Sequence, residues 1–257
     1  MPKLAANLST LFTEVEFLER FAAARAAGFR YVEYQFPYAW PAQEIARAAG
    51  SAGVQAVLHN LPAGDMARGE RGIACLPGRE REFRDGVERA IEYASASGCA
   101  RLNCIAGLAP VDREHFDALV ANVRHAARRL GEAGIELVIE PINTRSVPGF
   151  FLSRTLQAIE VLNAAGESNA RLQYDVFHMQ IMEGDLARTL ERLLGRIGHI
   201  QIADVPERHE PGSGEINFDF LLRHLDRIGY SAWVGCEYNP RGDTVAGLTW
   251  AKPYLSP

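Results

Sequence analysis

Short apolar runs alternate along the chain with longer amphipathic segments rich in Ala, Arg and Glu. The short runs are nearly continuously apolar, as expected of parallel strands that are covered on both faces. The longer segments repeat their apolar positions with helical spacing. The predicted strands are Leu4–Leu8, Tyr31–Tyr34, Val54–His59, Arg101–Ile105, Ile135–Glu140, Arg171–Asp175, His199–Ile202 and Trp233–Glu237. The predicted helices are Thr13–Ala27, Pro41–Ala52, Glu80–Ser97, Asp112–Ala133, Ser153–Ala165, Asp185–Arg196 and Phe218–Ile228.

Strand and helix alternate through the whole sequence, and glycine follows most of the predicted helices, where it is a common terminating residue. Eight such units predict a (β/α)8 barrel that forms a single domain over residues 1–257. The alternative is an open, doubly wound sheet. The first strand is not followed by GxGxxG, and the chain has no Walker A sequence, so the barrel is favoured.

Composition narrows the class of protein further. Of 257 residues, 47% are hydrophobic and 23% charged, which is ordinary for a packed domain. The net charge of −5 argues against a nucleic-acid partner, and no apolar run is long enough to span a membrane. Four scattered cysteines without CxxC, and an N-terminus without a signal-peptide pattern, predict reduced thiols in a cytoplasmic protein. We therefore expect a small-molecule partner.

Four oxygen-bearing side chains lie where the last four predicted strands end. Glu140, Asp175, Gln201 and Glu237 are separated by 35, 26 and 36 residues, each close to one strand–helix unit. A barrel brings these ends to one mouth, where active sites of this fold lie. Three crowded carboxylates repel one another unless a cation lies between them, and oxygen donors favour Mg²⁺ or Mn²⁺. The alternative for each carboxylate is an ion pair with Arg or Lys.

Other polar residues near the predicted mouth are candidates for substrate contacts. His178 follows Asp175 by three residues and could bond a substrate oxygen, or lie on the rim in solvent. Arg208 and Arg145 suit a substrate carboxylate, with a surface ion pair or a solvated loop as alternatives. Arg208 lies in one of two long loops at this face. These loops are Asn60–Gly78 and Asp204–Asn217. Three further candidates, as ligands, hydrogen-bond partners or core polar groups, are Glu33, His59 and Asn103.

Five long blocks of the sequence are more specific than any short motif. They are AANLSTLFTEVEFLERFAAARAAGF, LPGREREF, YDVFHMQ, HIQIADVPERHEPGSGEINF and WVGCEYNPRG. These blocks resemble the hydroxypyruvate isomerase family, within the xylose-isomerase-like barrels that also include 2-oxo-tetronate isomerases and ketose 3-epimerases, and the resemblance covers nearly the whole chain. It implies one divalent metal held by Glu140, Asp175, Gln201 and Glu237. Gln201 stands where the epimerases commonly have His, which favours the hydroxypyruvate isomerase branch.

The resemblance also implies the chemistry. Hydroxypyruvate and tartronate semialdehyde differ by a carbonyl and a hydroxyl exchanged between adjacent carbons, and a proton transfer through an enediolate interconverts them. Glu140 and Glu237 are the implied proton-transfer pair, with His178 and Arg208 as substrate contacts. A 2-oxo-tetronate isomerase is the alternative, and a ketose 3-epimerase is a weaker one. Members of this superfamily often associate, so a homo-oligomer is possible by analogy.

Overall fold

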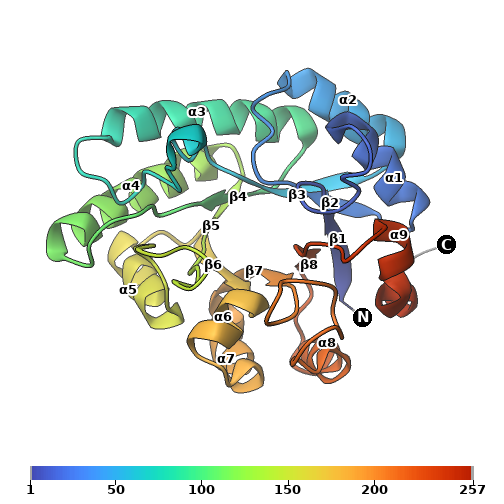
Figure 1. The fold of residues 1–257 in the computed structure, drawn as a ribbon. Coiled ribbons are helices and arrows are strands. Elements are labelled where there is room, and N and C mark those ends of the chain that lie inside the picture. Colours follow the sequence, from blue (N-terminus) through green and yellow to red (C-terminus); the bar gives the residue numbers. More distant parts are fainter. Residues whose placement is uncertain (1, 256–257) are drawn as a thin grey trace.

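Eight parallel strands form a closed barrel in the computed structural model, which describes residues 2–255 (Figure 1). They pair in sequence order, with β1 also paired to β8, so the predicted (β/α)8 fold is confirmed. Each strand lies within two residues of its predicted bounds. The strands are β1 (Lys3–Asn7), β2 (Tyr31–Glu33), β3 (Gln55–Asn60), β4 (Arg101–Cys104), β5 (Glu136–Ile139), β6 (Ala170–Asp175), β7 (Ile197–Ile202) and β8 (Trp233–Cys236).

Helices surround the barrel and bury their apolar faces against it (Figure 1). The α-helices are α1 (Arg20–Ala26), α2 (Ala42–Ala52), α3 (Glu80–Ser97), α4 (Arg113–Glu132), α5 (Thr155–Ala165), α6 (Val176–Met182), α7 (Leu186–Leu193), α8 (Phe218–Arg227) and α9 (Thr244–Gly247). Short 3-10 helices are η1 (Phe17–Glu19), η2 (Met66–Arg68), η3 (Leu194–Arg196) and η4 (Leu248–Tyr254). Within the described part of the chain, no helix has the length and apolarity needed to cross a membrane.

The prediction of one helix over Thr13–Ala27 is wrong for its first four residues, because helical structure begins only at η1. Phe12 has a φ of 59°, a left-handed conformation that does not continue into a right-handed helix. The Phe12 amide donates to Thr244 Oγ1 at 3.0 Å, and the Glu14 carboxylate accepts from the Thr244 amide at 2.7 Å. The segment before η1 is therefore fastened to the start of α9 instead of coiling.

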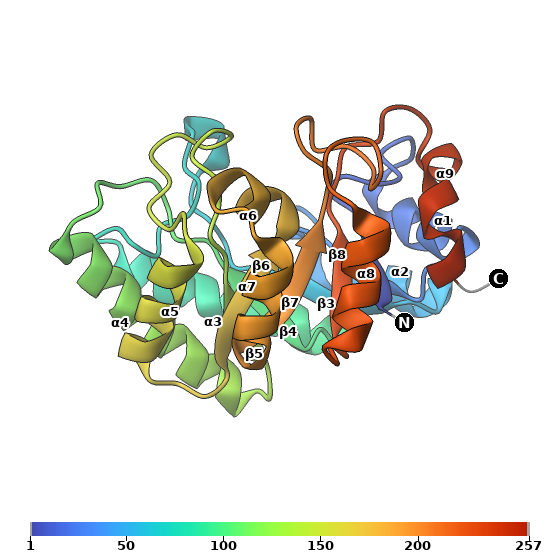
Figure 2. The same cartoon turned by 90° about the horizontal axis from the view of Figure 1, so that it is seen from below.

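The loops that follow the carboxyl ends of the strands gather at one end of the barrel (Figure 2). The long loop after β7 is organised by Asp204, whose carboxylate accepts from four backbone amides at 2.8–3.1 Å. Those amides belong to Val205, Gly212, Gly214 and Ile216. The loop is thus held in one shape by its own first residue.

All four cysteines are buried free thiols, in agreement with the prediction of reduced thiols. Cys104 lies on β4 and Cys236 on β8, while Cys99 precedes β4 and Cys75 lies in the loop between β3 and α3. Burial raises the pKa of Cys75, Cys99 and Cys104 to about 12. These thiols act as small apolar groups of the core.

Candidate active site

Three carboxylates meet at the end of the barrel where the strands terminate. Asp175 is the last residue of β6, whereas Glu140 and Glu237 each come one residue after β5 and β8. The predicted strands included both glutamates, so their bounds are corrected by one residue. All three side chains are buried, with 5%, 0% and 7% exposure for Glu140, Asp175 and Glu237. The fold thus brings together acids that are far apart in the sequence.

His178 joins this cluster because α6 begins directly after β6. Asp175 caps the helix: its Oδ1 accepts from the amides of Phe177 at 2.8 Å and His178 at 3.4 Å. The first turn therefore points His178 Nε2 toward Asp175 Oδ2 at 3.5 Å and Glu140 Oε1 at 3.9 Å. Asn143 Nδ2 lies 2.6 Å from the other ring nitrogen, Nδ1. The position of His178 at the mouth agrees with the sequence prediction.

Arg208 inserts a guanidinium between two of the acids. Its Nη2 donates to Glu237 Oε1 at 2.7 Å and to Asp175 Oδ2 at 3.2 Å. The residue has a φ of 60°, a conformation that costs free energy in a non-glycine residue and is found disproportionately at functional sites. Its backbone is held by hydrogen bonds to Asp204 and Asn239. Arg208 therefore partly neutralises the carboxylates from the loop after β7.

A buried clamp fixes the second oxygen of Glu237. Asn7 Nδ2 and Gln201 Nε2 both donate to Glu237 Oε2, and both also donate to Glu33 Oε1, at 2.9 and 2.7 Å. His199 Nε2 lies 2.6 Å from Glu33 Oε2, and neither of these two side chains has measurable exposure. Glu33 thus acts beneath the site as the partner that orients both amides.

The remaining predicted ligand and strand-end residues also take defined places. The Gln201 side-chain oxygen accepts from Gln173 Nε2 at 2.7 Å, so the amide would have to turn over to present its oxygen toward the mouth. The role of Gln201 as a ligand stays a prediction. Asn103 donates to Glu140 Oε2 at 2.9 Å. His59 is fully buried against Tyr34 and does not line the cavity.

Burial and mutual repulsion shift the ionisation of the cluster. Burial, followed by the charges of Glu237 and Asp175, raises the pKa of Glu140 well above its ordinary value. Burial likewise raises the pKa of Glu237 to about 7, against the lowering effect of Arg208. Burial also lowers the pKa of His178 to about 4, which keeps this imidazole neutral near pH 7. Burial is thus the main cause of both glutamate shifts, and the neighbouring negative charges add to it.

The donor set fits a divalent cation. Glu140, Asp175 and His178 each offer a ligand atom, and these atoms lie within 4.8 Å of one another. The carboxylate of Glu237 shares Arg208 with Asp175, so it belongs to the same cluster. Carboxylate oxygens with one imidazole suit Mg²⁺ or Mn²⁺, and such an ion would offset the repulsion that raises the pKa of Glu140.

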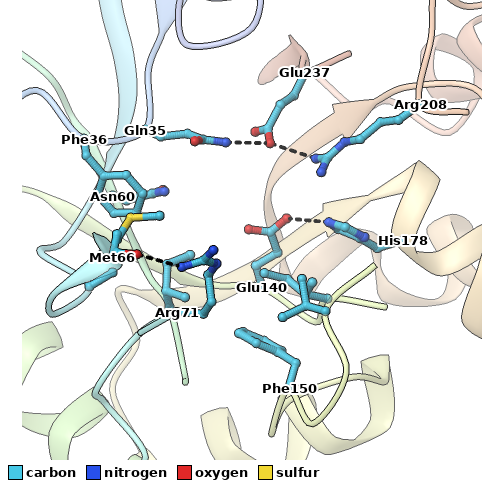
Figure 3. Close-up of a pocket in the computed structure, with 14 residues that line it drawn as sticks. Gln35, Phe36, Asn60, Met66, Arg71, Glu140, Phe150, His178, Arg208 and Glu237 are labelled. Atoms are coloured by element: carbon cyan, nitrogen blue, oxygen red, sulfur yellow. Dashed lines mark hydrogen bonds and ion pairs between the residues drawn. The ribbon is translucent and has the colours of Figure 1, made fainter. Parts of the chain in front are cut away.

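The cluster faces a cavity of about 230 Å³, in which acidic and basic side chains converge (Figure 3). Glu140, Glu237, His178 and Arg208 line it, whereas Asp175 and Gln201 do not; the roles assigned to these residues from the sequence stay predictions. Arg145 does not line the cavity either; its guanidinium bonds the Pro206 carbonyl at 3.2 Å. Sequence reasoning missed several participants that stand alone in loops or at strand ends without a motif. These are Asn7, Gln35, Arg71 and Asn143.

Comparisons with known proteins agree with this architecture. A family model described as xylose isomerase-like TIM barrel matches residues 21–254. The hydroxypyruvate isomerase of Escherichia coli K12 is 50% identical, covering 99% of this chain and 100% of that protein. The 2-oxo-tetronate isomerase of Cupriavidus necator is 47% identical and covers 99% of both chains. A crystal structure described as an AP endonuclease, family 2, from Brucella melitensis shares 47% identity and a TM-score of 0.98 over 100% of both chains.

The matches extend over the full barrel and include the strand ends that carry the acids. Identities of 47–50% over 99% of the chain are far above the level at which only a fold is shared. The resemblance drawn from the sequence blocks is therefore confirmed. The chain belongs to the hydroxypyruvate isomerase family of xylose isomerase-like TIM barrels, and it is an enzyme of the isomerase class.

Proposed function

We propose that this enzyme interconverts hydroxypyruvate and tartronate semialdehyde by intramolecular proton transfer. The observation that carries the proposal is a set of buried side chains, Glu140, His178 and Glu237, that line a small cavity. Asp175 lies within metal-ligand reach of the first two. The cavity is of a size for a short hydroxy-oxo acid, and two carboxyl groups reach it from different strands. The similarity to hydroxypyruvate isomerase of Escherichia coli supports the same substrate class.

In the proposed reaction, Glu140 and Glu237 are the proton-transfer pair. One carboxylate takes a proton from the hydroxymethyl carbon of hydroxypyruvate, which leaves an enediolate. The other carboxyl group of the pair delivers a proton to the neighbouring carbon. The proton of the original hydroxyl group moves to the former carbonyl oxygen. Burial raises the pKa of both carboxyl groups, that of Glu237 to about 7, and a raised pKa suits a carboxyl group that must both accept and return a proton.

The other residues hold the substrate and the acids in place. Neutral His178 accepts from Asn143 Nδ2 at Nδ1, so its proton lies on Nε2, which can donate a hydrogen bond to a substrate oxygen. Arg208 holds Glu237 and Asp175 and can contact a substrate oxygen with its remaining nitrogens. Glu140, Asp175 and Glu237, with His178 or a turned-over Gln201, would hold a divalent metal. When bound, that metal would stabilise negative charge on the substrate oxygens as a Lewis acid.

A 2-oxo-tetronate isomerase is the second candidate, favoured by the 47% identity to the Cupriavidus necator enzyme. It would use the same proton transfer on a substrate one carbon longer. A ketose 3-epimerase is less well supported, because Gln201 stands where epimerases commonly have His and because the arginines of the cavity suit an acid rather than a free sugar. Cleavage of DNA, suggested by the Brucella melitensis structure's description, would call for a His-rich metal site and a basic surface. The described cluster has one histidine, and the chain carries a net charge of −5.

Turnover of hydroxypyruvate and of a 2-oxo-tetronate by the purified protein tests this proposal. Each acid is assayed after EDTA treatment and again after Mg²⁺ or Mn²⁺ is added back. We expect activity to require metal and to fall at least about 1000-fold in Glu140→Gln and in Glu237→Gln, since each removes a proton-transfer group. Glu114→Gln, on the exposed face of α4, is the matched control and should behave as wild type. Full activity without metal, or in either cavity variant, would refute the proposed site.

A further inference from the structure

A second arginine lines the cavity and plays no part in the acid cluster. Arg71 lies in the loop between β3 and α3 and reaches the cavity near Glu140, beside Met66 (Figure 3). Its Nη1 donates to the backbone carbonyls of Glu70 at 2.8 Å and Met66 at 3.3 Å. Over residues 2–255, no carboxylate forms an ion pair with it. Two carbonyls thus anchor one nitrogen and leave the rest of the guanidinium available.

The nearest acid in the sequence is engaged by another arginine. Glu70 accepts from Arg79 Nη1 at 2.8 Å, and Arg79 also bonds Glu82 at 2.6 Å. Because this pairing holds the Glu70 carboxylate, it is not free to neutralise Arg71. The positive charge of Arg71 therefore faces the cavity without an acidic partner from its own loop.

The loop that carries Arg71 is fixed against the barrel. Gly72 has a φ of 104°, and its amide donates to the Ala63 carbonyl at 3.0 Å. A Cβ at Gly72 would lie 2.4 Å from the Ile105 carbonyl oxygen, so glycine alone permits this close approach to the segment after β4. The Cys75 amide continues the contact with a 2.8 Å bond to the Ala106 carbonyl. Arg71 is therefore presented from a defined backbone position.

The balance of charges in the cavity indicates which kind of ligand Arg71 can bind. Glu140, Asp175 and Glu237 carry three negative charges when ionised, and Arg208 compensates one of them through its contacts with two of these acids. A divalent cation would compensate the remaining two. Arg71 then adds a positive charge that the protein does not balance, at the end of the cavity where a substrate's carboxylate can form bidentate hydrogen bonds.

We propose that Arg71 binds the carboxylate of the substrate and makes the enzyme selective for 2-oxo acids over uncharged ketoses. This inference rests on the proposed isomerase function. It places the recognition of the carboxylate on the loop after β3, opposite the loop after β7 in which the sequence suggested Arg208 for that role. Arg208 stays paired with Asp175 and Glu237, so its charge compensates these carboxylates.

Steady-state kinetics with two matched substrates test the inference. Hydroxypyruvate carries the carboxylate, whereas dihydroxyacetone has the same carbon skeleton with a hydroxymethyl group in its place. Arg71→Met keeps a long apolar side chain and should raise the KM for hydroxypyruvate roughly 10- to 100-fold. The KM of dihydroxyacetone, or its inhibition constant if it is not turned over, should change less than about twofold. The KM of Arg71→Lys for hydroxypyruvate should lie between those of the wild type and Arg71→Met. Arg68, an exposed arginine of the same loop, provides the control, and Arg68→Met should have the wild-type KM.

Equilibrium binding provides a readout that does not depend on turnover. Hydroxypyruvate is titrated calorimetrically into Glu140→Gln and into the Glu140→Gln/Arg71→Met double variant, and we expect the same roughly 10- to 100-fold loss of affinity. Unchanged KM and affinity for hydroxypyruvate in the Arg71 variants, or equal losses for both substrates, would overturn the inference alone. Absence of turnover of either acid by the wild-type enzyme would overturn the proposed function and this inference together.

Discussion

Gly235 on β8 leaves the space that the Glu33 carboxylate occupies beneath the site. A Cβ at this position would lie 2.3 Å from Oε2, 2.4 Å from Oε1 and 2.5 Å from Cδ of Glu33. Ordinary contacts of a Cβ are 3.4–4 Å, so the carboxylate in Gly235→Ala would have to move by about 1 Å. Glu33 cannot move freely, because Asn7, Gln201 and His199 hold both of its oxygens.

The expected cost of Gly235→Ala follows from these contacts. Overpacking in a filled core costs about 1–3 kcal/mol, and weakening hydrogen bonds to a buried carboxylate adds a comparable amount. We expect the free energy of unfolding to fall by about 2–4 kcal/mol. Since Asn7 and Gln201 also bind Glu237, the variant should lose catalytic rate as well.

Chemical unfolding followed by circular dichroism, in a double-mutant cycle with Glu33→Ala, measures this cost. Once Glu33 is truncated, Gly235→Ala meets free space and should cost less than about 0.5 kcal/mol, so the two substitutions should be strongly non-additive. Gly50→Ala, in α2 where a Cβ meets nothing within 4 Å, is the control and should stabilise by about 0.5–1 kcal/mol. Additive effects, or a neutral Gly235→Ala, would refute the reasoning.

Two further predictions concern the loop after β7 and a buried histidine. Asp204→Asn removes one of the two acceptor oxygens that hold four amides, so hydrogen exchange over 205–216 should become faster by mass spectrometry; unchanged exchange would contradict the assigned role. Burial lowers the pKa of His59 from 6.5 to about 4, so the unfolded chain binds more protons between these values. Stability should therefore be lost as pH falls from 6.5 to 4, by up to about 3 kcal/mol, and His59→Phe should flatten this part of the curve. Parallel curves for the two proteins would exclude His59 as the cause.

The strand ends could be predicted because two signals coincide there. Continuous apolar runs locate the barrel strands, and one acid or amide closes each of the last four, so the sequence pattern alone places Glu140, Asp175 and Glu237 at one mouth. The position of His178 follows from its spacing to Asp175. The substrate contacts proposed for His178 and Arg208 are not fixed by that spacing and stay predictions.

Contacts between loops distant in the sequence could not be predicted. The left-handed Phe12 and its bond to Thr244 interrupt a segment with helical periodicity, and only the tertiary structure shows the pairing. Helix α6 was not predicted because it starts at Val176, directly after the last residue of β6, without an intervening loop. Arg71 is one of several arginines in a polar loop, and its place in the cavity depends on the close backbone approach at Gly72.

The reactivity of the buried thiols reports on fluctuations that open the structure. With pKa values of about 12, Cys75, Cys99 and Cys104 carry almost no thiolate at neutral pH. An alkylating reagent therefore reacts with them only after a fluctuation exposes the thiol to solvent. Cys75 lies in the Arg71 loop, whereas Cys236 is part of β8. Early reaction of Cys75 alone would therefore indicate local opening of the loop at the cavity, whereas reaction of Cys236 would indicate unfolding of the barrel strands.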